Sequence, residues 1–559
     1  MASSLKKFQE ILKYEKEEIS SIYFYAILMG LLQLSVPLGI QSIISFVLGG
    51  SISTSIVLLI IFVVVGVLIN GKLHVNQMKI IEKIQQQLFV RYSFQYAHSI
   101  PKLDLRNADS YYLPELVNRF FDTISLQKGI SKILLEVPAA MLQMIFGLIL
   151  LSFYHPVFIL FGALLMLVVF MILRFSGRRG FQTSLEESTH KYKVAAYLQE
   201  LARAVISFKF SKNGSLHLQK TDGYVQRYLQ SRTEHFKILL FQYWTLIGFK
   251  VAITAAMLIV GAVLLVNQQL NIGQFIAAEI VIIMVINSVE KLVLNLEQVY
   301  DVMTSLEKIS KLTDKKKEEE SHQQLDASNG ISLSLKDVSF GFTDDKSVLK
   351  NISLELKAGE KVCVMGVHSA GKSTLLRFLT GSYRPYQGSF SINGLSANSY
   401  DVRSLRAHTG IVLYQQEIFE GTLLENILMN SDTSRLAEVQ QLAAIVGLQN
   451  FIEHSPEGYD MQVKNNGQHL AGKIVKKILL LRALVNQPKL LLLEEPWTGL
   501  ETEDATRIKN YLLHETKEIT TVLISNDETV AAACDKVVFL ENGIIKAAGT
   551  WQEVNQLIS

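Results

Sequence analysis

The sequence predicts a two-part fold, in which an all-α polytopic membrane domain is followed by an α/β domain that carries a phosphate-binding loop. Of the 559 residues, 49% are hydrophobic and only 19% are charged, and the apolar excess lies almost entirely before residue 300. From about residue 330, short β-rich segments alternate with helical segments. A charged run, Lys-Lys-Lys-Glu-Glu-Glu, lies between the two parts at residues 315–320 and is typical of a solvated linker.

These composition shifts set the expected boundaries. We expect an amphipathic N-terminal helix at residues 1–20, a membrane domain at 21–312, a linker at 313–329 and the α/β domain at 330–559. In the first segment Leu5, Phe8, Ile11, Leu12 and Ile19 recur at near-helical intervals among charged residues. A soluble surface helix has a similar pattern, but the apolar run that follows favours a helix at a membrane surface.

Six apolar runs are candidates to cross a bilayer, which needs about 20 apolar residues. They are residues 22–48, 52–69, 133–153, 156–173, 238–266 and 272–293. The connectors after the first, third and fifth runs contain no Lys or Arg, whereas the two connectors after the second and fourth are long and rich in both. This bias places the N-terminus and the long connectors in the cytoplasm.

The two long connectors, residues 71–132 and 174–237, carry apolar residues at helical spacing and have few helix breakers. The sequence therefore predicts that the membrane helices extend well into the cytoplasm. Short polar breaks at residues 107–110 and 212–215 are the expected distal turns.

The α/β domain is organised around residues 361–374, where an apolar strand leads into a glycine-bounded loop and then a helix. The spacing of Gly366, Gly371, Lys372 and Ser373 is that of a phosphate loop. In such a loop the backbone N–H groups surround a polyphosphate, the lysine contacts its terminal phosphates and the serine hydroxyl contacts Mg²⁺. A chance glycine loop is the alternative, and the strand before and the helix after argue against it.

A second segment, residues 490–495, is a run of four leucines that ends in Glu494 and Glu495. A buried strand that ends in paired acids is the expected place for a Mg²⁺-directed carboxylate and a water-polarising carboxylate. A hydrophobic strand with a charged end is the alternative. The phosphate loop upstream favours the functional interpretation.

With six spans ahead of these motifs, the chain resembles the half-transporters of the exporter type in the ATP-binding cassette family, over essentially all 559 residues. The resemblance implies that Phe342 stacks on adenine, that Gln415 or Gln416 is the glutamine-loop residue, and that residues 498–501 form a dimer-contact loop. It implies ATP and Mg²⁺ as cofactors, with Ser373, Gln415 and Glu494 directed at the metal. The implied nucleotide-binding residues are Phe342, Gly366, His368, Ser369, Ala370, Gly371, Lys372, Ser373 and Thr374.

Several positions depart from the family pattern. Where the family has Leu-Ser-Gly-Gly-Gln, a segment that covers the γ-phosphate on the opposite subunit, this chain has Leu-Ala-Gly-Lys-Ile at residues 470–474. Ala471 removes the hydroxyl, and Lys473 adds bulk beside Gly472. Two alternatives stay open for Lys473: its charge near the phosphate offsets the loss, or its side chain blocks close approach.

Two further departures concern hydrolysis. Glu494 replaces the family's metal-directed Asp and is one methylene longer, and Asn526 replaces the switch His, so it cannot carry the charge or shuttle a proton. Glu495, the expected general base, is retained. We therefore expect ATP·Mg²⁺ binding with slow or partner-dependent hydrolysis, with Glu495, Asn526 and Gln415 as the catalytic set.

Lys250, Glu279 and Glu290 fall within the last two apolar runs, where charge is costly and usually faces a cavity or a partner. Lys250 and Glu290 lie at similar depth and can pair, and a structural ion pair is as good an explanation as a place on the substrate pathway. Glu279, shallower and without an obvious partner, is the better pathway candidate.

The resemblance implies an integral membrane protein of the bacterial inner membrane with a cytoplasmic nucleotide domain, working in the lipid bilayer as a homodimer or as a heterodimer with another half-transporter. It implies alternating access driven by ATP and export of a peptide, lipid or hydrophobic compound. The alternative is a catalytically weak or regulatory subunit whose partner carries the turnover. The net charge of +3, without a basic stripe, argues against a nucleic-acid partner.

Overall fold

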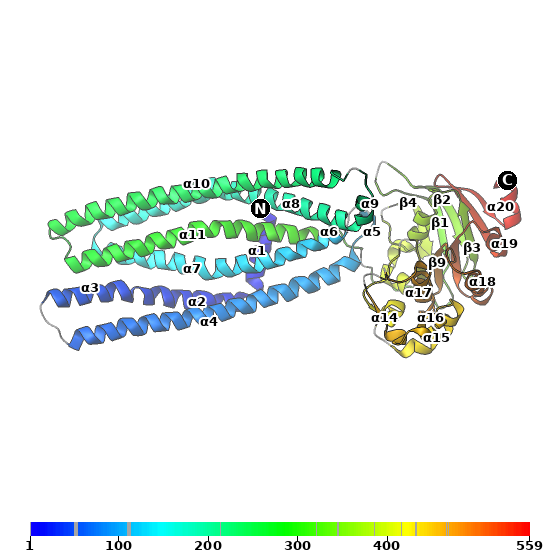
Figure 1. Ribbon diagram of the computed structural model, residues 1–559, viewed down its shortest axis with the longest axis horizontal. Coiled ribbons are helices and arrows are strands. Elements are labelled where there is room, and N and C mark those ends of the chain that lie inside the picture. Colours follow the sequence, from blue (N-terminus) through cyan, green and yellow to red (C-terminus); the bar gives the residue numbers. More distant parts are fainter. Residues whose placement is uncertain are drawn as a thin grey trace. The chain divides into compact units, whose positions relative to one another are not determined.

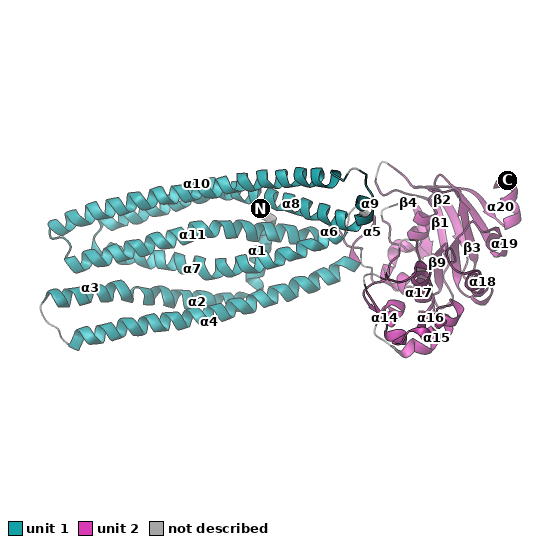
Figure 2. Ribbon diagram, viewed as in Figure 1, with its two compact units in different colours: residues 1–101, 112–315 teal, residues 102–111, 316–559 magenta. Residues whose placement is uncertain are grey.

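The computed structural model describes residues 2–49, 54–108, 113–212, 214–319, 321–343, 346–384, 386–414, 416–430, 433–464, 467 and 469–558. These residues form two compact units (Figures 1 and 2). Unit 1 comprises residues 1–101 and 112–315, and unit 2 comprises residues 102–111 and 316–559. The change from unit 1 to unit 2 after Lys315 falls within the charged run of the sequence.

Unit 1 is built from long helices (Figure 1). They are α1 (Ala2–Tyr14), α2 (Lys16–Gln33), α3 (Ser35–Leu48), α4 (Thr54–Ser99), α6 (Leu113–Val117), η2 (Asn118–Phe121), α7 (Asp122–Tyr154), α8 (Val157–Arg203), α9 (Val205–Lys209), α10 (Leu216–Val266) and α11 (Ile272–Thr313), together with most of the short turn η1 (Ile100–Lys102). Within the described residues six helical segments are long and apolar enough to cross a membrane. The predicted all-α polytopic domain is therefore confirmed.

The helices run far beyond a bilayer's width. α4 has 46 residues, which is about 70 Å at 1.5 Å per residue, against a hydrocarbon core of about 30 Å. Of the two expected distal turns, the second falls between the end of α9 at Lys209 and the start of α10 at Leu216. The first expected turn, residues 107–110, lies partly outside the described residues, after the short helix α5 (Leu105–Ala108).

The N-terminal region differs from the prediction of one helix over residues 1–20. α1 ends at Tyr14, and α2 begins at Lys16, so residues 16–19 belong to the helix of the first span. That span is itself interrupted between α2 and α3, at Leu34. Pro37 accounts for this interruption because it has no N–H to donate to the Gln33 carbonyl four residues earlier.

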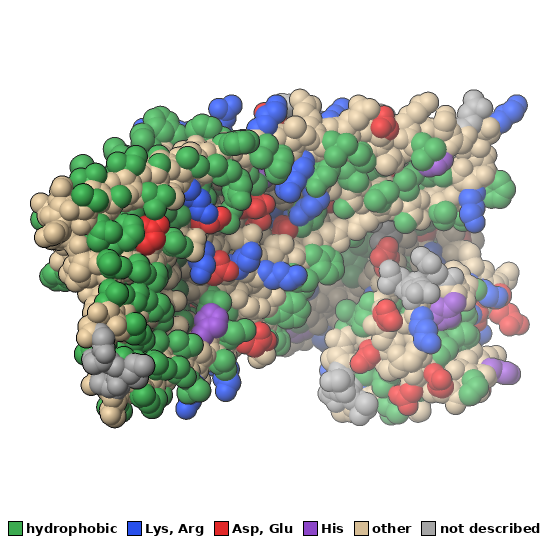
Figure 3. Space-filling model, turned by 60° about the vertical axis from the view of Figure 1, so that its left-hand side comes forward, with side chains coloured by type: hydrophobic (Ala, Val, Ile, Leu, Met, Phe, Trp, Pro, Cys, Tyr) green, Lys and Arg blue, Asp and Glu red, His purple; other side chains and the backbone are tan. Residues whose placement is uncertain are grey.

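α7 and α11 make the most extensive helix pair of unit 1, and small residues allow it. A Cβ on Gly129 would lie 2.4 Å from Val302, and a Cβ on Gly147 would lie 2.6 Å from Val285, both on α11. Such close approach of two backbones is typical of helix association in membranes. α4, in contrast, exposes most of its apolar side chains, and Figure 3 shows hydrophobic side chains covering long stretches of the helical part.

Unit 2 is an α/β domain, as predicted, and its larger sheet is mainly parallel. The six-stranded sheet has the order β12 (Ile544–Gly549), β11 (Lys536–Glu541), β3 (Lys361–Gly366), β10 (Thr520–Ile524), β9 (Leu490–Glu494) and β6 (Thr409–Val412), and only β12 is antiparallel to its neighbour. A four-stranded antiparallel sheet has the order β2 (Leu349–Leu356), β1 (Leu333–Phe340), β4 (Gln387–Ile392) and β5 (Leu395–Ser396), and β7 (Gly421–Thr422) pairs with β8 (Gln462–Val463).

The helices of unit 2 connect these strands. They are α12 (Lys372–Phe378), η3 (Ala397–Ser399), α13 (Val402–Ala407), α14 (Leu423–Leu428), η4 (Thr433–Arg435), α15 (Leu436–Ile445), α16 (Gln449–His454), η5 (Gly458–Asp460), α17 (Gly472–Leu484), α18 (Thr502–Asn510), η7 (Tyr511–Glu515), α19 (Glu528–Ala533) and α20 (Trp551–Ile558).

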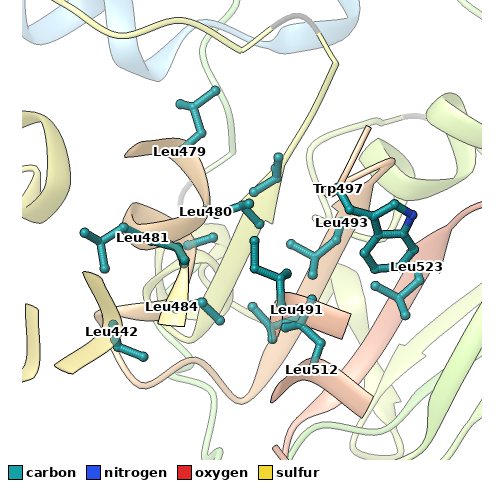
Figure 4. Packing of buried hydrophobic residues seen from close by; sticks show 14 of the residues in the cluster. Leu442, Leu479, Leu480, Leu481, Leu484, Leu491, Leu493, Trp497, Leu512 and Leu523 are labelled. Carbon is teal, nitrogen blue, oxygen red and sulfur yellow. The ribbon is translucent and has the colours of Figure 1, made fainter. Parts of the chain in front are cut away.

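One hydrophobic cluster joins α17 to the central strands. Leu480 and Leu484 of α17 share it with Leu491 and Leu493 of β9 and with Trp497, which follows β9 (Figure 4). This packing fixes the second half of α17 relative to β9.

Candidate functional site

The predicted site lies at the carboxyl ends of three adjacent parallel strands. β3 ends at Gly366, β9 at Glu494 and β10 at Ile524, and the register places Ile524 opposite both Glu494 and Val364. Ligands bind α/β sheets at this edge. Segments that are more than 120 residues apart in the sequence therefore meet at the phosphate loop.

The loop after β3 needs glycine at two points. Gly366 has φ +148°, and a Cβ there would lie 2.1 Å from the Leu540 carbonyl oxygen. Gly371 has φ +98°, and Ser369 between them also has a positive φ of +61°. The backbone is thus held in a conformation that an ordinary residue at 366 would destroy.

The Lys372 side chain lies back over this loop. Its Nζ donates to the carbonyl oxygens of Gly366, at 2.6 Å, and Val367, at 2.8 Å. Burial lowers the pKa of Lys372, and the charges of Glu495 and Glu494 oppose that change. Among the other predicted loop residues, His368 and Ser369 are exposed, Ala370 is buried, and Ser373 and Thr374 are half-buried.

Two of the three residues predicted to contact Mg²⁺ meet. Ser373 Oγ donates to Glu494 Oε1 at 2.5 Å, and Tyr414 N–H donates to Glu494 Oε2 at 3.1 Å. A hydroxyl and a carboxylate are oxygen ligands of the kind Mg²⁺ takes alongside substrate phosphates, so the residues fit this metal. Among the described residues no cluster of three or more His, Cys, Asp or Glu side chains could hold a metal alone.

The third predicted metal residue, Gln415, lies outside the described residues. The alternative glutamine-loop residue, Gln416, is described: its Oε1 accepts from the Leu413 N–H at 3.2 Å.

Glu495 directly follows β9 in an unusual backbone conformation. Its φ is +43°, which is uncommon for a residue with a Cβ and costs about 1 kcal/mol or more. Its N–H donates to Ile524 O at 3.0 Å, and its Oε2 accepts from Thr498 Oγ1 at 3.1 Å. The carboxylate is thus held at the same sheet edge as the phosphate loop.

Asn526 follows β10, and its Oδ1 accepts from the Gly366 N–H at 3.3 Å. The residue predicted as the switch position therefore contacts the phosphate loop directly. The next residue, Asp527, caps α19 and accepts from Lys509 Nζ at 2.5 Å. The hydrogen bonds from Lys509 and Thr529 lower the pKa of Asp527 to about 2.

The segment that departs from the family pattern begins α17. Ala471 is the N-cap, and no side chain caps the helix there because alanine has no hydroxyl. A Cβ on Gly472 would meet only open space. Lys473 Nζ lies 2.5 Å from Glu501 Oε1 of the same chain, and both side chains are 47% exposed. Lys473 therefore already has a partner.

The sequence interpretation missed Lys476. Its Nζ donates to the Glu495 carbonyl oxygen at 2.5 Å and to the Thr498 carbonyl oxygen at 3.1 Å. Lys473, Lys476 and Lys477 lie at i, i+3 and i+4 on α17 and all contact the segment from Glu495 onward. The spacing of these three lysines in the sequence could have indicated the contact, because it puts three cations on one helix face.

Phe342, the residue predicted to stack on adenine, is half-buried and packs edge-on against Phe340 and Tyr383, with ring centroids 5.3 and 5.5 Å apart.

The ionisable residues of the membrane spans lie in unit 1. Lys250 and Glu290 form an ion pair. Glu279 lies elsewhere on α11, and its Oε2 is buried without a hydrogen-bond partner among the described residues. The structure thus brings Lys250 and Glu290 together and leaves Glu279 apart.

Comparisons with known proteins agree with this architecture. The family model described as ABC transporter transmembrane region matches residues 20–289, and the model described as ABC transporter matches residues 349–498. The beta-(1→2)glucan export ATP-binding/permease protein NdvA of Agrobacterium fabrum is 28% identical over 387 residues, which are 67% of this chain and 64% of NdvA.

The heterocyst differentiation ATP-binding protein HepA of Nostoc sp. is 30% identical over 223 residues, 40% of this chain and 37% of HepA. The matched regions thus span less than two thirds of the length of these relatives. A bacterial Atm1-family ABC exporter with ATP bound superposes with a TM-score of 0.87 over 97% of this chain and 96% of that one, at 18% sequence identity.

Proposed function

The chain belongs to the ABC transporter family, as a half-transporter with six membrane spans fused to one nucleotide-binding domain, and on this premise we propose that it is one subunit of a dimeric ATP-driven exporter. Family membership implies ATP binding and translocation coupled to ATP hydrolysis. We place the protein in the bacterial inner membrane, with its nucleotide domain in the cytoplasm.

The observation that carries the proposal is the convergence at the sheet edge. Lys372 would contact the terminal phosphates, and Ser373 and Glu494 would hold Mg²⁺, which lessens the negative charge of the phosphates when bound. Glu495 would orient the attacking water and accept its proton. Asn526, hydrogen-bonded to the loop through its Oδ1, keeps its amide N–H₂ group available as a donor.

In the proposed dimer each nucleotide lies between one subunit's phosphate loop and the other subunit's segment 471–473. Closure of the two nucleotide domains would draw the long helical extensions together and open the spans outward, and hydrolysis would reset them. The extensions support this proposal because helices of this length reach well past the bilayer.

A second candidate function is favoured by one set of observations. Ala471 provides no hydroxyl, and Asn526 cannot shuttle a proton. These features support a catalytically weak or regulatory subunit of a heteromeric transporter. Such a subunit would bind ATP while its partner carries most of the turnover.

The two functions are separated by ATPase measurements on the purified full chain in lipid. Turnover by the lone chain that Glu495→Gln abolishes, with nucleotide binding retained, supports an active homodimer. Binding without turnover, followed by turnover when a second half-transporter is added, supports the weak subunit. Failure to bind a fluorescent ATP analogue even in wild type contradicts both.

A further inference from the structure

A cavity of about 620 Å³ lies within unit 1, among helices of the membrane spans. Its walls come from the end of α2, the start of α3, the middle of α7 and the middle of α11. Its lining residues are Gln33, Val36, Pro37, Gln143, Ile280, Ile283, Met284, Asn287, Glu290, Lys291 and Leu294. The volume is in the range that holds a drug-sized molecule.

Three carboxamides face this cavity without protein partners. The side chains of Gln33, Gln143 and Asn287 make no hydrogen bond with any described residue, although each sits within a membrane span. Asn287 is exposed, and Gln33 and Gln143 are half-buried, so none of the three needs a protein partner. Because the three groups come from different helices and line one cavity, a single molecule in it can contact all of them. Each carboxamide can both donate and accept, so a hydrogen-bonding head group satisfies them.

The charges on the cavity wall do not cancel. Glu290 is paired with Lys250, so its negative charge is already compensated. Lys291, next along α11, has no hydrogen-bond or ion-pair partner among the described residues. The wall therefore carries one exposed ammonium that no described side chain compensates, and this charge attracts an anion.

The rest of the lining is apolar, supplied by Val36, Ile280, Ile283, Met284 and Leu294. One part of the cavity wall is thus polar and positively charged, and the rest is apolar. We propose that the cavity binds an acidic amphiphile, a drug-sized molecule with one anionic, hydrogen-bonding head group on an apolar body. We further propose that such molecules are the class of compound that the protein exports. The cargo role rests on the proposed exporter function. The binding itself does not.

The test uses two probes that differ only in charge. N-lauroylglycine carries a carboxylate, and its primary amide is neutral with the same chain and head size. Binding of each tritiated probe to the purified full chain is measured by scintillation proximity in neutral detergent. We expect the acid to bind at least about tenfold more tightly than the amide, the effect of one partly desolvated charge pair. Equal affinities would overturn the proposal.

Variants assign the effect to residues. Lys291→Gln should remove the discrimination between the probes, and Lys291→Arg should keep it. Asn287→Leu should weaken both probes alike. Arg174→Gln on α8, which removes a positive charge outside the cavity lining, is the matched control and should change nothing. Discrimination that survives Lys291→Gln, or that Arg174→Gln also abolishes, would contradict the assignment.

The outcome is separable from the exporter proposal because binding needs no ATP. A chain that discriminates between the probes but does not move N-lauroylglycine into inverted vesicles with ATP supports the cavity assignment and contradicts its role in export. A chain that hydrolyses ATP and exports other compounds, but binds both probes equally, contradicts the cavity assignment alone.

Discussion

Replacing Lys476 tests whether this side chain of α17 holds the backbone turn at Glu495 in place. Its ammonium donates to two main-chain carbonyls of the turn that begins at Glu495, where the backbone holds a positive φ. Lys476→Met removes both donors and keeps most of the side chain's apolar length. We expect slower ATP turnover with unchanged nucleotide affinity, because the Lys476 ammonium donates to the turn after β9 and not to the phosphate loop.

The magnitude follows from the two contacts, at 2.5 and 3.1 Å. A hydrogen bond from a charged donor contributes about 1.5–3 kcal/mol, and Lys476 is only half-buried, so we take the lower end for the pair together. If that energy holds Glu495 in place, its loss corresponds to a fall in kcat of about 10-fold, at 1.36 kcal/mol per tenfold in rate. Burial lowers the pKa of Lys476, so the substitution also relieves a desolvation cost and the chain should still fold.

The assay is steady-state ATP hydrolysis by the full chain in lipid, with KM and kcat determined separately. Lys476→Arg should restore part of kcat because a guanidinium can donate to both carbonyls. Lys350→Met, an exposed lysine on β2 without a side-chain partner among the described residues, is the control. If Lys476→Met raises KM and leaves kcat at the wild-type value, the positioning argument is wrong.

Three further substitutions have definite expected outcomes. Gly366→Ala should abolish binding of a fluorescent ATP analogue, because its methyl would lie 2.1 Å from a carbonyl oxygen, whereas Gly472→Ala meets open space within its own chain and should keep the melting temperature. Lys250→Met should destabilise the chain by about 3 kcal/mol by leaving Glu290 unpaired, and the double replacement Lys250→Met/Glu290→Met should recover most of the loss in a thermal melt. Ala471→Ser supplies the missing N-cap and should raise the melting temperature of the nucleotide domain by about 2–4 °C, for a gain of about 1 kcal/mol.

The fold could be predicted from the sequence because the sequence patterns that indicate it extend over many residues. A membrane span needs about 20 apolar residues, and a phosphate loop fixes strand, turn and helix within 14 residues, so each pattern has few alternatives. The break at Leu34 was missed because the hydrophobic run continues through it, and only Pro37 marks the place where a helical hydrogen bond is lost. The end of α1 at Tyr14 was missed because no helix breaker separates it from the span.

The site could be predicted where a residue type dictates a role and could not where a contact depends on packing. Ser373 and Glu494 were assigned to one metal and meet at 2.5 Å. Lys476 could not be assigned, because its partners are main-chain carbonyls that any sequence would present. The cavity in unit 1 was likewise hidden, since Gln33 and Gln143 are more than 100 residues apart and only the tertiary fold places them on one wall.

Lys473 departs from the family pattern, and the sequence alone allowed either compensation by its charge or steric blocking by its side chain. Its partner in the structure, Glu501, helps to choose between the two. The hydrogen bond from Lys473 lowers the pKa of Glu501 to about 2, yet an ion pair this exposed to water contributes little to stability. A phosphate accepts charge-assisted hydrogen bonds from an ammonium as a carboxylate does. Glu501 can therefore hold the ammonium while no phosphate is near, and the pair does not prevent the ammonium from turning to a phosphate that comes close. The weakness of this pair favours compensation by charge over steric blocking.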